Sequence, residues 1–295
     1  MKYIVISEAN EASRNIGKFI EAMQFRANVE VIRTKNNVLD LEKDLEGIKD
    51  AEIIIVASTH KSGAKVPMLN AHFTGNFGND ISYGGSASTL SIAPALYQRA
   101  AVLEYAKLQK ENPKLKDYVV GIEATHHGPT LDLPILFVEV GSTEKEWNDL
   151  VACEAASRVI EKLVKTAPSE MVHGGNKQNS REFCCTTKPA GFVCQEDPQT
   201  ERGQSPLAVR VAVGFGGGHY CPHFTKKLFT EGFAFGHICP KYAADNLAEE
   251  VILQLINKTL PKPDKVFVEH KGLSGEQRKN IISVLNKNNI EWEKV

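Results

Sequence analysis

The sequence has 295 residues, 42% of them apolar, and its 35 lysines and arginines nearly balance its 36 aspartates and glutamates, for a net charge of -1. This length suits one large domain or two fused lobes, with a core that needs no disulfide bonds. The charge excludes binding of nucleic acid through bulk positive charge, and no apolar run reaches the roughly 18 residues of a membrane helix.

Short β-rich runs alternate with amphipathic stretches along the chain, which predicts an α/β fold of layers with a central mixed, mostly parallel sheet. The first strand is followed directly by polar residues, so we expect neither a signal peptide nor a membrane anchor. The run from Glu52 to Ala57 is continuously apolar and belongs in the middle of the sheet. The expected strands are residues 3–7, 29–33, 52–57, 118–123, 135–140, 208–213, 234–237 and 265–269.

Four stretches have the apolar spacing of helices that face a core. Two of them open with a capping box, in which Ser or Thr is followed three residues later by Glu or Gln. A further helix is expected at a proline after the last glycine-rich loop, because proline favours the first helical position. These helices are expected at residues 12–23, at about 87–109, and from Thr143, Ser274 and Pro222.

The segment from His173 to Pro206 is polar and lacks periodicity. We interpret it as an insertion loop within a single α/β catalytic unit of residues 1–295, or within two closely fused lobes. It holds Cys184, Cys185 and Cys194, whose spacing matches no common zinc motif. The six cysteines follow no framework spacing, which favours the reducing cytoplasm.

Most of the nine histidines lie in or beside short polar loops that follow expected strands. Ligands of open α/β sheets bind at the carboxyl ends of strands, so this placement predicts one polar site. His60 follows the most buried strand, where a lone histidine is more often structural than functional. His72 precedes Gly75 and Asn76, which permit positive φ and expose N–H groups, although this loop alone is weak evidence.

The segment EATHHGPT contains the strongest local pattern. Glu123 supplies a carboxylate, His126 and His127 supply imidazoles, and Thr130 supplies a hydroxyl. These groups can bind a metal, act as a general base or donate hydrogen bonds. Adjacent histidines at a turn point in different directions, so only one of the two need face the site. The alternative interpretation is a solvated polar turn.

The segment GFGGGHYCPH forms a glycine-rich loop before the helix expected at its end. The N–H groups of Gly216 to Gly218 can approach a phosphate or an oxyanion, and the helix start adds a positive dipole end. The loop is neither a dinucleotide-binding nor a Walker motif, which disfavours a nicotinamide cofactor and ATP. His219 and His223 could ligate zinc, with Cys221 as a third ligand.

Two later segments repeat this composition. His237 lies at the end of an expected strand beside Lys241, and His270 follows another strand beside Lys271. Each segment alone could be a structural turn. The shared occurrence of histidine, glycine and threonine at strand ends nevertheless favours a single functional site.

Five strings resemble the archaeal and plant type of D-aminoacyl-tRNA deacylase: THHGPT, GGGHY, HFTGN, EVGSTEKEW and FGHICPKYA. The similarity runs in order from Met1 to about Val295, broken mainly by the insertion. It implies hydrolysis of the ester between a D-amino acid and tRNA, which proofreads chirality and recycles the tRNA. It also implies two zinc ions per subunit and a fold similar to nucleoside phosphorylases and peptidyl-tRNA hydrolases.

The chain departs from the family strings GGGHYAP and GHILPKY at Cys221 and Cys239, where the family has alanine and leucine. A metal site shared with the family would leave these cysteines out, so the hypothesis of a Cys/His zinc site around Cys221 is withdrawn. His223 also lies outside the shared strings.

An aminoacyl ester is already labile, so its hydrolysis needs positioning, an activated water and a stabilised oxyanion. With the resemblance, we predict catalytic groups, zinc ligands and lysines that contact the acceptor end of D-aminoacyl-tRNA in a monomer or small homo-oligomer. The predicted catalytic residues are Glu123, His126, His127, Thr130, Gly217 and Gly218; the zinc ligands are His72, His126, His219 and His237; the lysines are Lys226, Lys227, Lys241 and Lys271.

Two alternatives from other classes remain at this point. The glycine-rich loop alone is compatible with a metal-dependent nucleoside hydrolase or phosphorylase. A non-catalytic RNA-binding protein is the second alternative, although it leaves the grouping of the histidines unexplained.

Overall fold

The larger of two main sheets has six strands in the order β2-β1-β3-β7-β4-β6 in the computed structural model, which describes residues 1–171 and 209–295. All neighbouring pairs are parallel except β4 with β7. The predicted mixed, mostly parallel sheet is therefore confirmed, and the apolar strand β3 lies inside it as expected. The strands are β1 (Lys2–Ser7), β2 (Val29–Thr34), β3 (Ile53–Lys61), β4 (Met68–His72), β6 (Val119–Ile122) and β7 (Ile135–Ser142).

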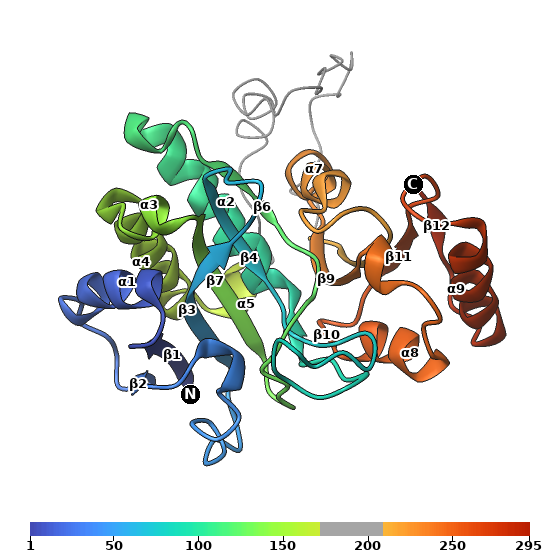
Figure 1. The fold of residues 1–295 in the computed structure, drawn as a ribbon, viewed down its shortest axis with the longest axis horizontal. Coiled ribbons are helices and arrows are strands. Elements are labelled where there is room, and N and C mark those ends of the chain that lie inside the picture. Colours follow the sequence, from blue (N-terminus) through green and yellow to red (C-terminus); the bar gives the residue numbers. More distant parts are fainter. Residues whose placement is uncertain (172–208) are drawn as a thin grey trace.

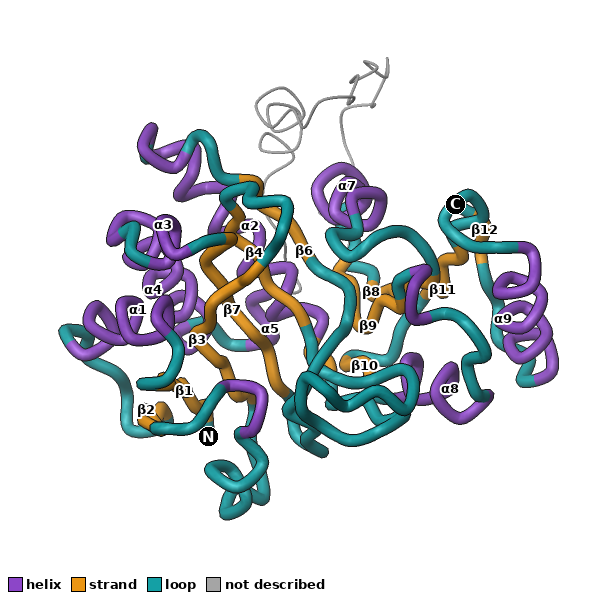
Figure 2. The backbone as a smooth tube through the Cα atoms, viewed as in Figure 1, coloured by secondary structure: helices purple, strands orange, loops and turns teal. Residues whose placement is uncertain are grey.

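The smaller sheet has four parallel strands in the order β12-β11-β8-β9, and β5 pairs with β10. Figures 1 and 2 show the two main sheets side by side, with the chain ends at opposite sides of the molecule. Ile4 of β1, Val120 of β6 and Phe235 of β9 belong to one continuous apolar core. The strands are β5 (Ala93–Pro94), β8 (Val211–Phe215), β9 (Ala234–Cys239), β10 (Thr259–Leu260), β11 (Lys265–Val268) and β12 (Glu293–Lys294).

Helices α1, α2 and α4 pack on one face of the larger sheet, and α7 packs beside β6 (Figure 1). No helix in residues 1–171 and 209–295 is long and apolar enough to cross a membrane. The helices are α1 (Glu11–Glu21), α2 (Ala95–Glu111), α3 (Glu144–Trp147), α4 (Leu150–Lys165), α5 (Pro168–Met171), α7 (Pro222–Glu231), α8 (Glu249–Asn257) and α9 (Gly275–Lys287), with 3-10 turns at Val38–Asp40, Pro113–Leu115 and Lys241–Ala243.

Both predicted capping boxes are present, at Thr143 and Ser274. The long helix expected from Thr143 is two helices, because Asp149 caps a new helix by accepting a hydrogen bond from the Val151 N–H at 2.9 Å. The helix expected from about residue 87 begins at Ala95, since residues 87 and 88 form a turn and Ala93 pairs with β10. The expected insertion, with Cys184, Cys185 and Cys194, lies outside the described residues.

Alternate residues of neighbouring strands place polar side chains on one face of the larger sheet. Glu139 of β7 stands opposite Ser58 of β3 and Asn70 of β4. His60 follows Ser58 by two residues, and His72 follows Asn70 by two residues, so both histidines lie on the same face as Glu139. The register of three strands thereby brings separate parts of the sequence together.

The other half of this face is apolar. Ile54 and Val56 of β3 and Ile135 of β7 pack there against Val38 and Leu41. A strand that is apolar at its start and polar near its end thus serves the core and the polar site at once.

The sequence pattern predicts a polar site at a carboxyl edge of the sheet. The structure places it elsewhere. Because β4 runs antiparallel to β7, His72 pairs with Phe137 near the start of β7, whereas His60 pairs with Gly141 near its end. The polar site therefore spans the middle of β7, and Glu139 is at its centre.

Gly141 of β7 packs tightly against His60 of β3. A Cβ at this position would lie 2.4 Å from the His60 carbonyl oxygen and 2.5 Å from the His60 Cβ. We expect Gly141→Ala to lower the free energy of unfolding by about 3 kcal/mol, because overpacking forces the two strands apart. Gly63→Ala is the matched control, since a Cβ there meets no atom of the described chain within 4 Å. Urea unfolding of both variants checks this, and equal stability of the two would contradict it.

Candidate active site

Histidine and glutamate side chains form overlapping groups on the polar face, and the ligand atoms within each group lie within 4.8 Å of one another. The groups are His72 with His126 and His127; His60 with Glu123 and His219; and His72 with Glu123 and Glu139. We call the side chains of these three groups the polar cluster. It joins residues from β3, β4 and β7 to the loops that follow β6 and β8.

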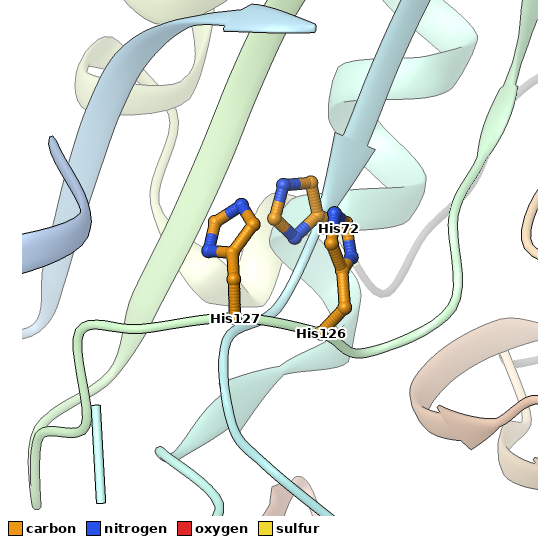
Figure 3. Close-up of side chains that lie close together, drawn as sticks. All are labelled: His72, His126 and His127. Atoms are coloured by element: carbon orange, nitrogen blue, oxygen red, sulfur yellow. The ribbon is translucent and has the colours of Figure 1, made fainter. Parts of the chain in front are cut away.

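Both adjacent histidines of the THHGPT string lie in the cluster, although only one of the two need face the site on the sequence argument. Figure 3 shows His126 and His127 on the loop after β6 with their rings on the same side, next to His72 of β4. The ring centroids of His126 and His127 are 4.3 Å apart, and that of His126 is 4.1 Å from that of His72. His127 has a φ of 43°, and this left-handed backbone turns its side chain toward that of its neighbour.

Backbone hydrogen bonds fix the loop that carries these histidines. The Ala124 N–H donates to the His219 carbonyl at 2.8 Å, which joins the loops after β6 and β8. The Gly75 N–H donates to the His127 carbonyl at 2.8 Å, which joins the loop after β4. Three loops thus hold each other in place around the cluster.

Two buried carboxylates connect the histidine groups. Glu139 Oε1 lies 3.6 Å from His72 Nε2, and its Oε2 lies 3.7 Å from His60 Nδ1. Glu123 Oε1 lies 3.1 Å from His60 Nδ1 and accepts a hydrogen bond from Asn70 Nδ2 at 2.9 Å, while its Oε2 is 3.6 Å from His219 Nε2. The two carboxylates therefore join the histidine groups into one continuous cluster.

Hydrogen bonds at Nδ1 fix the protonation pattern of several rings. His72 Nδ1 donates to the Phe73 carbonyl at 3.0 Å, His126 Nδ1 donates to the Ala124 carbonyl at 2.8 Å, and His127 Nδ1 donates to the Gly128 carbonyl. A carbonyl can only accept, so each Nδ1 carries the proton, and Nε2 of a neutral ring presents a lone pair. Histidines that ligate metals commonly donate their other N–H to such an oxygen.

The pKa shifts separate the histidines into two kinds. Burial, together with the neighbouring His72, His127 and His219, holds the pKa of His126 well below its usual value, and burial and His72 lower the pKa of His127 to about 3. Burial also acts to lower the pKa of His60 and His72, but Glu139 and Glu123 outweigh it and raise both. Of these four rings, His60 and His72, which lie beside the carboxylates, therefore favour the charged imidazolium form, whereas His126 and His127 favour the neutral form.

The fit of the cluster to a metal ion rests on its unsatisfied atoms. Within residues 1–171 and 209–295, His72 Nε2 and Glu123 Oε2 are buried and have no hydrogen-bond partner. Leaving buried polar atoms unpaired is costly, and a cation would satisfy both of these. The donor set consists of imidazole nitrogens and carboxylate oxygens, which are ordinary zinc ligands. None of the groups found in the described ranges contains a cysteine.

His237 lies outside the cluster, although the sequence predicts it as a zinc ligand. It is fully buried, its Nδ1 accepts a hydrogen bond from the Thr125 hydroxyl at 2.9 Å, and its Nε2 donates to the Ser91 carbonyl at 2.9 Å. Both ring nitrogens are therefore engaged in hydrogen bonds, and the structure does not bring this predicted zinc ligand together with the others.

Thr130 and the glycine-rich loop also have structural roles that the sequence does not reveal. The Thr130 hydroxyl accepts a hydrogen bond from the Ser86 N–H at 2.8 Å and so holds a neighbouring loop. The N–H groups of Gly216 and Gly217 donate to the carbonyls of Cys239 and Gly272, at 2.8 and 3.3 Å. The sequence interpretation of this loop requires free N–H groups to bind an oxyanion. The N–H groups of Gly216 and Gly217 are already used and are not available for that role.

The predicted tRNA-contacting lysines differ in their surroundings. Lys226, Lys241 and Lys271 are exposed. Lys227 pairs with Glu231 at 2.9 Å and lies over the Phe267 ring, 4.7 Å from its centroid, so its charge is already engaged.

Sequence reasoning missed His60 and Glu139 as members of the site. A structural role is favoured for His60 because it stands alone in its segment, and Glu139 enters only as part of an apolar strand and of the string EVGSTEKEW. The available signal is a polar residue at alternate positions of a buried strand, as in MLNAH and ILFVEVGS. Such residues are buried with the strand and need partners there.

Comparison with known proteins gives consistent matches along the chain. Residues 48–293 match the family described as D-aminoacyl-tRNA deacylase. The chain is 31% identical to the D-aminoacyl-tRNA deacylase of Methanocaldococcus jannaschii with 100% of both chains covered, and 32% identical to that of Thermococcus kodakarensis with 99% of both covered. A crystal structure of a conserved protein of unknown function shares the fold, with a TM-score of 0.76 and 22% identity over 100% of this chain and 95% of its own.

His237 also predicts how stability depends on pH. Burial lowers the pKa of His237 to about 4, so the folded protein does not take up a proton at this ring until the pH falls to that value. An unfolded histidine takes it up near pH 6.5, so stability is lost as the pH falls from 6.5 to 4, by about 3 kcal/mol for this group. His237→Gln should lack this part of the loss.

The measurement is chemical denaturation of the parent and His237→Gln between pH 7 and pH 4. All other residues are the same in both proteins, so the difference between the two curves isolates His237. A constant difference in unfolding free energy across this range would contradict the assignment.

Proposed function

This chain belongs to the D-aminoacyl-tRNA deacylase family, and we propose that its polar cluster is the site at which the ester bond of D-aminoacyl-tRNA is hydrolysed. As a member of that family it is a hydrolase that releases a D-amino acid and tRNA. The convergence of the histidines with the buried carboxylates of Glu123 and Glu139 is the observation that carries the location. Clusters of strongly perturbed titratable groups are where enzymes act on substrates.

We propose zinc as the metal, with His72, His126 and His127 holding one ion and His60, Glu123 and His219 holding a second. Glu139 lies between the two groups, since its oxygens face His72 and His60. His72 Nε2 and Glu123 Oε2 are buried without a hydrogen-bond partner in the described part of the chain, which supports this assignment. Bound zinc supplies a Lewis acid that polarises a carbonyl and lowers the pKa of water to about 7.

The protein's own residues orient the reaction. His60 is held by the indole N–H of Trp147, which donates to the His60 carbonyl at 2.9 Å. The ester would approach from the side of His219, whose side chain is 29% exposed while that of Glu123 is fully buried. Groups that are fixed before the substrate arrives need little reorganisation during the reaction, which lowers its barrier.

Glu139 supplies a negative charge at the centre of the polar cluster. Burial alone would raise its pKa, but the adjacent His72 and His60 hold the pKa of Glu139 well below its usual range. It is therefore an anion at neutral pH, and it stabilises positive charge on either side. The exposed lysines Lys226, Lys241 and Lys271 would contact the phosphates of the acceptor end.

Substitution in the cluster tests the site. We expect Glu139→Gln and His126→Ala each to lower kcat/KM for D-Tyr-tRNA by more than about 100-fold, because they remove a central charge or a ligand. His223→Ala is the matched control: this histidine is 38% exposed and lies 3.9 Å from Glu269, outside the cluster.

The assay compares deacylation of D-Tyr-tRNA and L-Tyr-tRNA, with circular dichroism to confirm folding. Wild-type rates in both cluster variants would place the reaction elsewhere. Retention of tRNA without deacylation by the parent protein would favour a binding module, and turnover of free nucleosides would favour a nucleoside hydrolase.

Metal removal tests zinc separately. We expect the purified protein to contain about two zinc ions per chain by elemental analysis, in line with the two ligand groups. Chelation should abolish deacylation and lower the thermal midpoint, and zinc should restore both, because a ligand that binds only the folded state stabilises it. Full deacylation by protein shown to be metal-free would remove zinc from the reaction.

A further inference from the structure

A hollow of about 490 Å³ is bordered by Tyr242, which contacts His219 of the cluster. Its lining includes Gly217, Gly218 and Gly272 together with Lys241, Tyr242 and Asp245. The volume falls within the roughly 300–1,000 Å³ that is usual for small-molecule pockets. The cluster ligands are not among its lining residues, so its role is distinct from theirs.

Tyr242 connects the hollow to the cluster. Its hydroxyl lies 2.9 Å from His219 Nδ1, and His219 Nε2 lies 3.6 Å from Glu123 Oε2. A group in the hollow is therefore separated from the cluster by a single tyrosine side chain. If the ester is hydrolysed at the cluster, as proposed above, the hollow receives whichever part of the substrate adjoins the ester.

The floor of the hollow is backbone. Gly217 has a φ of 77°, a backbone conformation that is strained for a residue with a side chain, and a Cβ there would lie 2.6 Å from Glu269 Oε2. A Cβ at Gly218 would meet no atom of the described chain within 4 Å, which indicates open space above it. A flat ring can approach such a floor closely.

The walls offer an aromatic face, a carboxylate and a cation. Tyr242 is 60% exposed, so its ring is accessible for stacking. Gln277 Nε2 donates to Asp245 Oδ1 at 2.7 Å and to the Lys241 carbonyl at 2.9 Å, while its Oε1 accepts from the Ser274 N–H at 2.8 Å. Gln277 is thus fully used in fixing the wall, and it holds the Asp245 carboxylate in position.

We propose that this hollow binds the 3′-terminal nucleoside of tRNA with its 5′-phosphate. The base stacks on Tyr242, a ribose hydroxyl or an exocyclic amine donates to Asp245, and Lys241 pairs with the phosphate. The other neighbour of the ester is the amino acid, which carries neither the phosphate that Lys241 would pair with nor the ribose hydroxyls from which Asp245 would accept.

Binding of AMP to the full-length protein, measured by isothermal titration calorimetry, tests this proposal. Tyr242→Ala should weaken AMP binding about tenfold or more, because base stacking on an aromatic ring is lost. Tyr242→Phe keeps the ring and should stay within about threefold of the parent. Lys241→Ala should weaken AMP binding and leave adenosine binding unchanged. Tyr83→Ala is the matched control, because Tyr83 is 67% exposed and does not line the hollow.

Equal AMP affinity in all variants, or an equal loss in Tyr83→Ala, would overturn the assignment. Binding of free D-tyrosine that is lost in Tyr242→Ala while AMP affinity is unchanged would assign the hollow to the amino acid and overturn it as well. The assay needs no hydrolysis, so its result is independent of the proposed activity. A protein that deacylates D-Tyr-tRNA but fails to bind AMP would refute this inference alone, whereas AMP binding that depends on Tyr242 in an inactive protein would support it alone.

Discussion

The contact of Glu139 with His60 and His72 is the interaction on which the rest of the site depends. A carboxylate in the middle of a buried strand is costly unless it is paired, since burial removes its hydration. Its partners lie 3.7 and 3.6 Å away on the two neighbouring strands, one on each side. The ion pairs keep the carboxylate charged, and that charge makes the centre of the sheet attractive to protons or to cations.

The reversed direction of β4 makes this arrangement possible. If β4 ran parallel to β7, the carboxyl ends of all the strands would meet at one edge, and His72 would lie beside Gly141 and not beside Phe137. A shift of one residue in register would turn every polar side chain to the helix-covered face. The site therefore requires this register, and the apolar half of the same face, with Ile54 and Val56 packed against Val38, helps to fix it.

The separation in sequence between interacting residues decides which features of the structure can be predicted from the sequence. The long apolar strands and the capped helices follow from local patterns, and both are present in the structure. The sequence pattern does not predict strand β4, because two of its five residues, Asn70 and His72, are polar and are typical of loops. The membership of Glu139 depends on pairing with strands far away in sequence, and the occupied nitrogens of His237 depend on Ser91 and Thr125. Local composition contains neither fact.

The near-neutral charge of the chain sets a condition on how it could hold a tRNA. With a net charge of -1, long-range attraction to phosphates contributes little, so affinity must come from short-range contacts at the acceptor end. Tyr242 is placed to use such contacts, because its ring borders the hollow while its hydroxyl meets His219. Binding energy from the nucleoside would then orient a ligand of the cluster. In this way contacts remote from the ester bond contribute to its hydrolysis as well as to affinity.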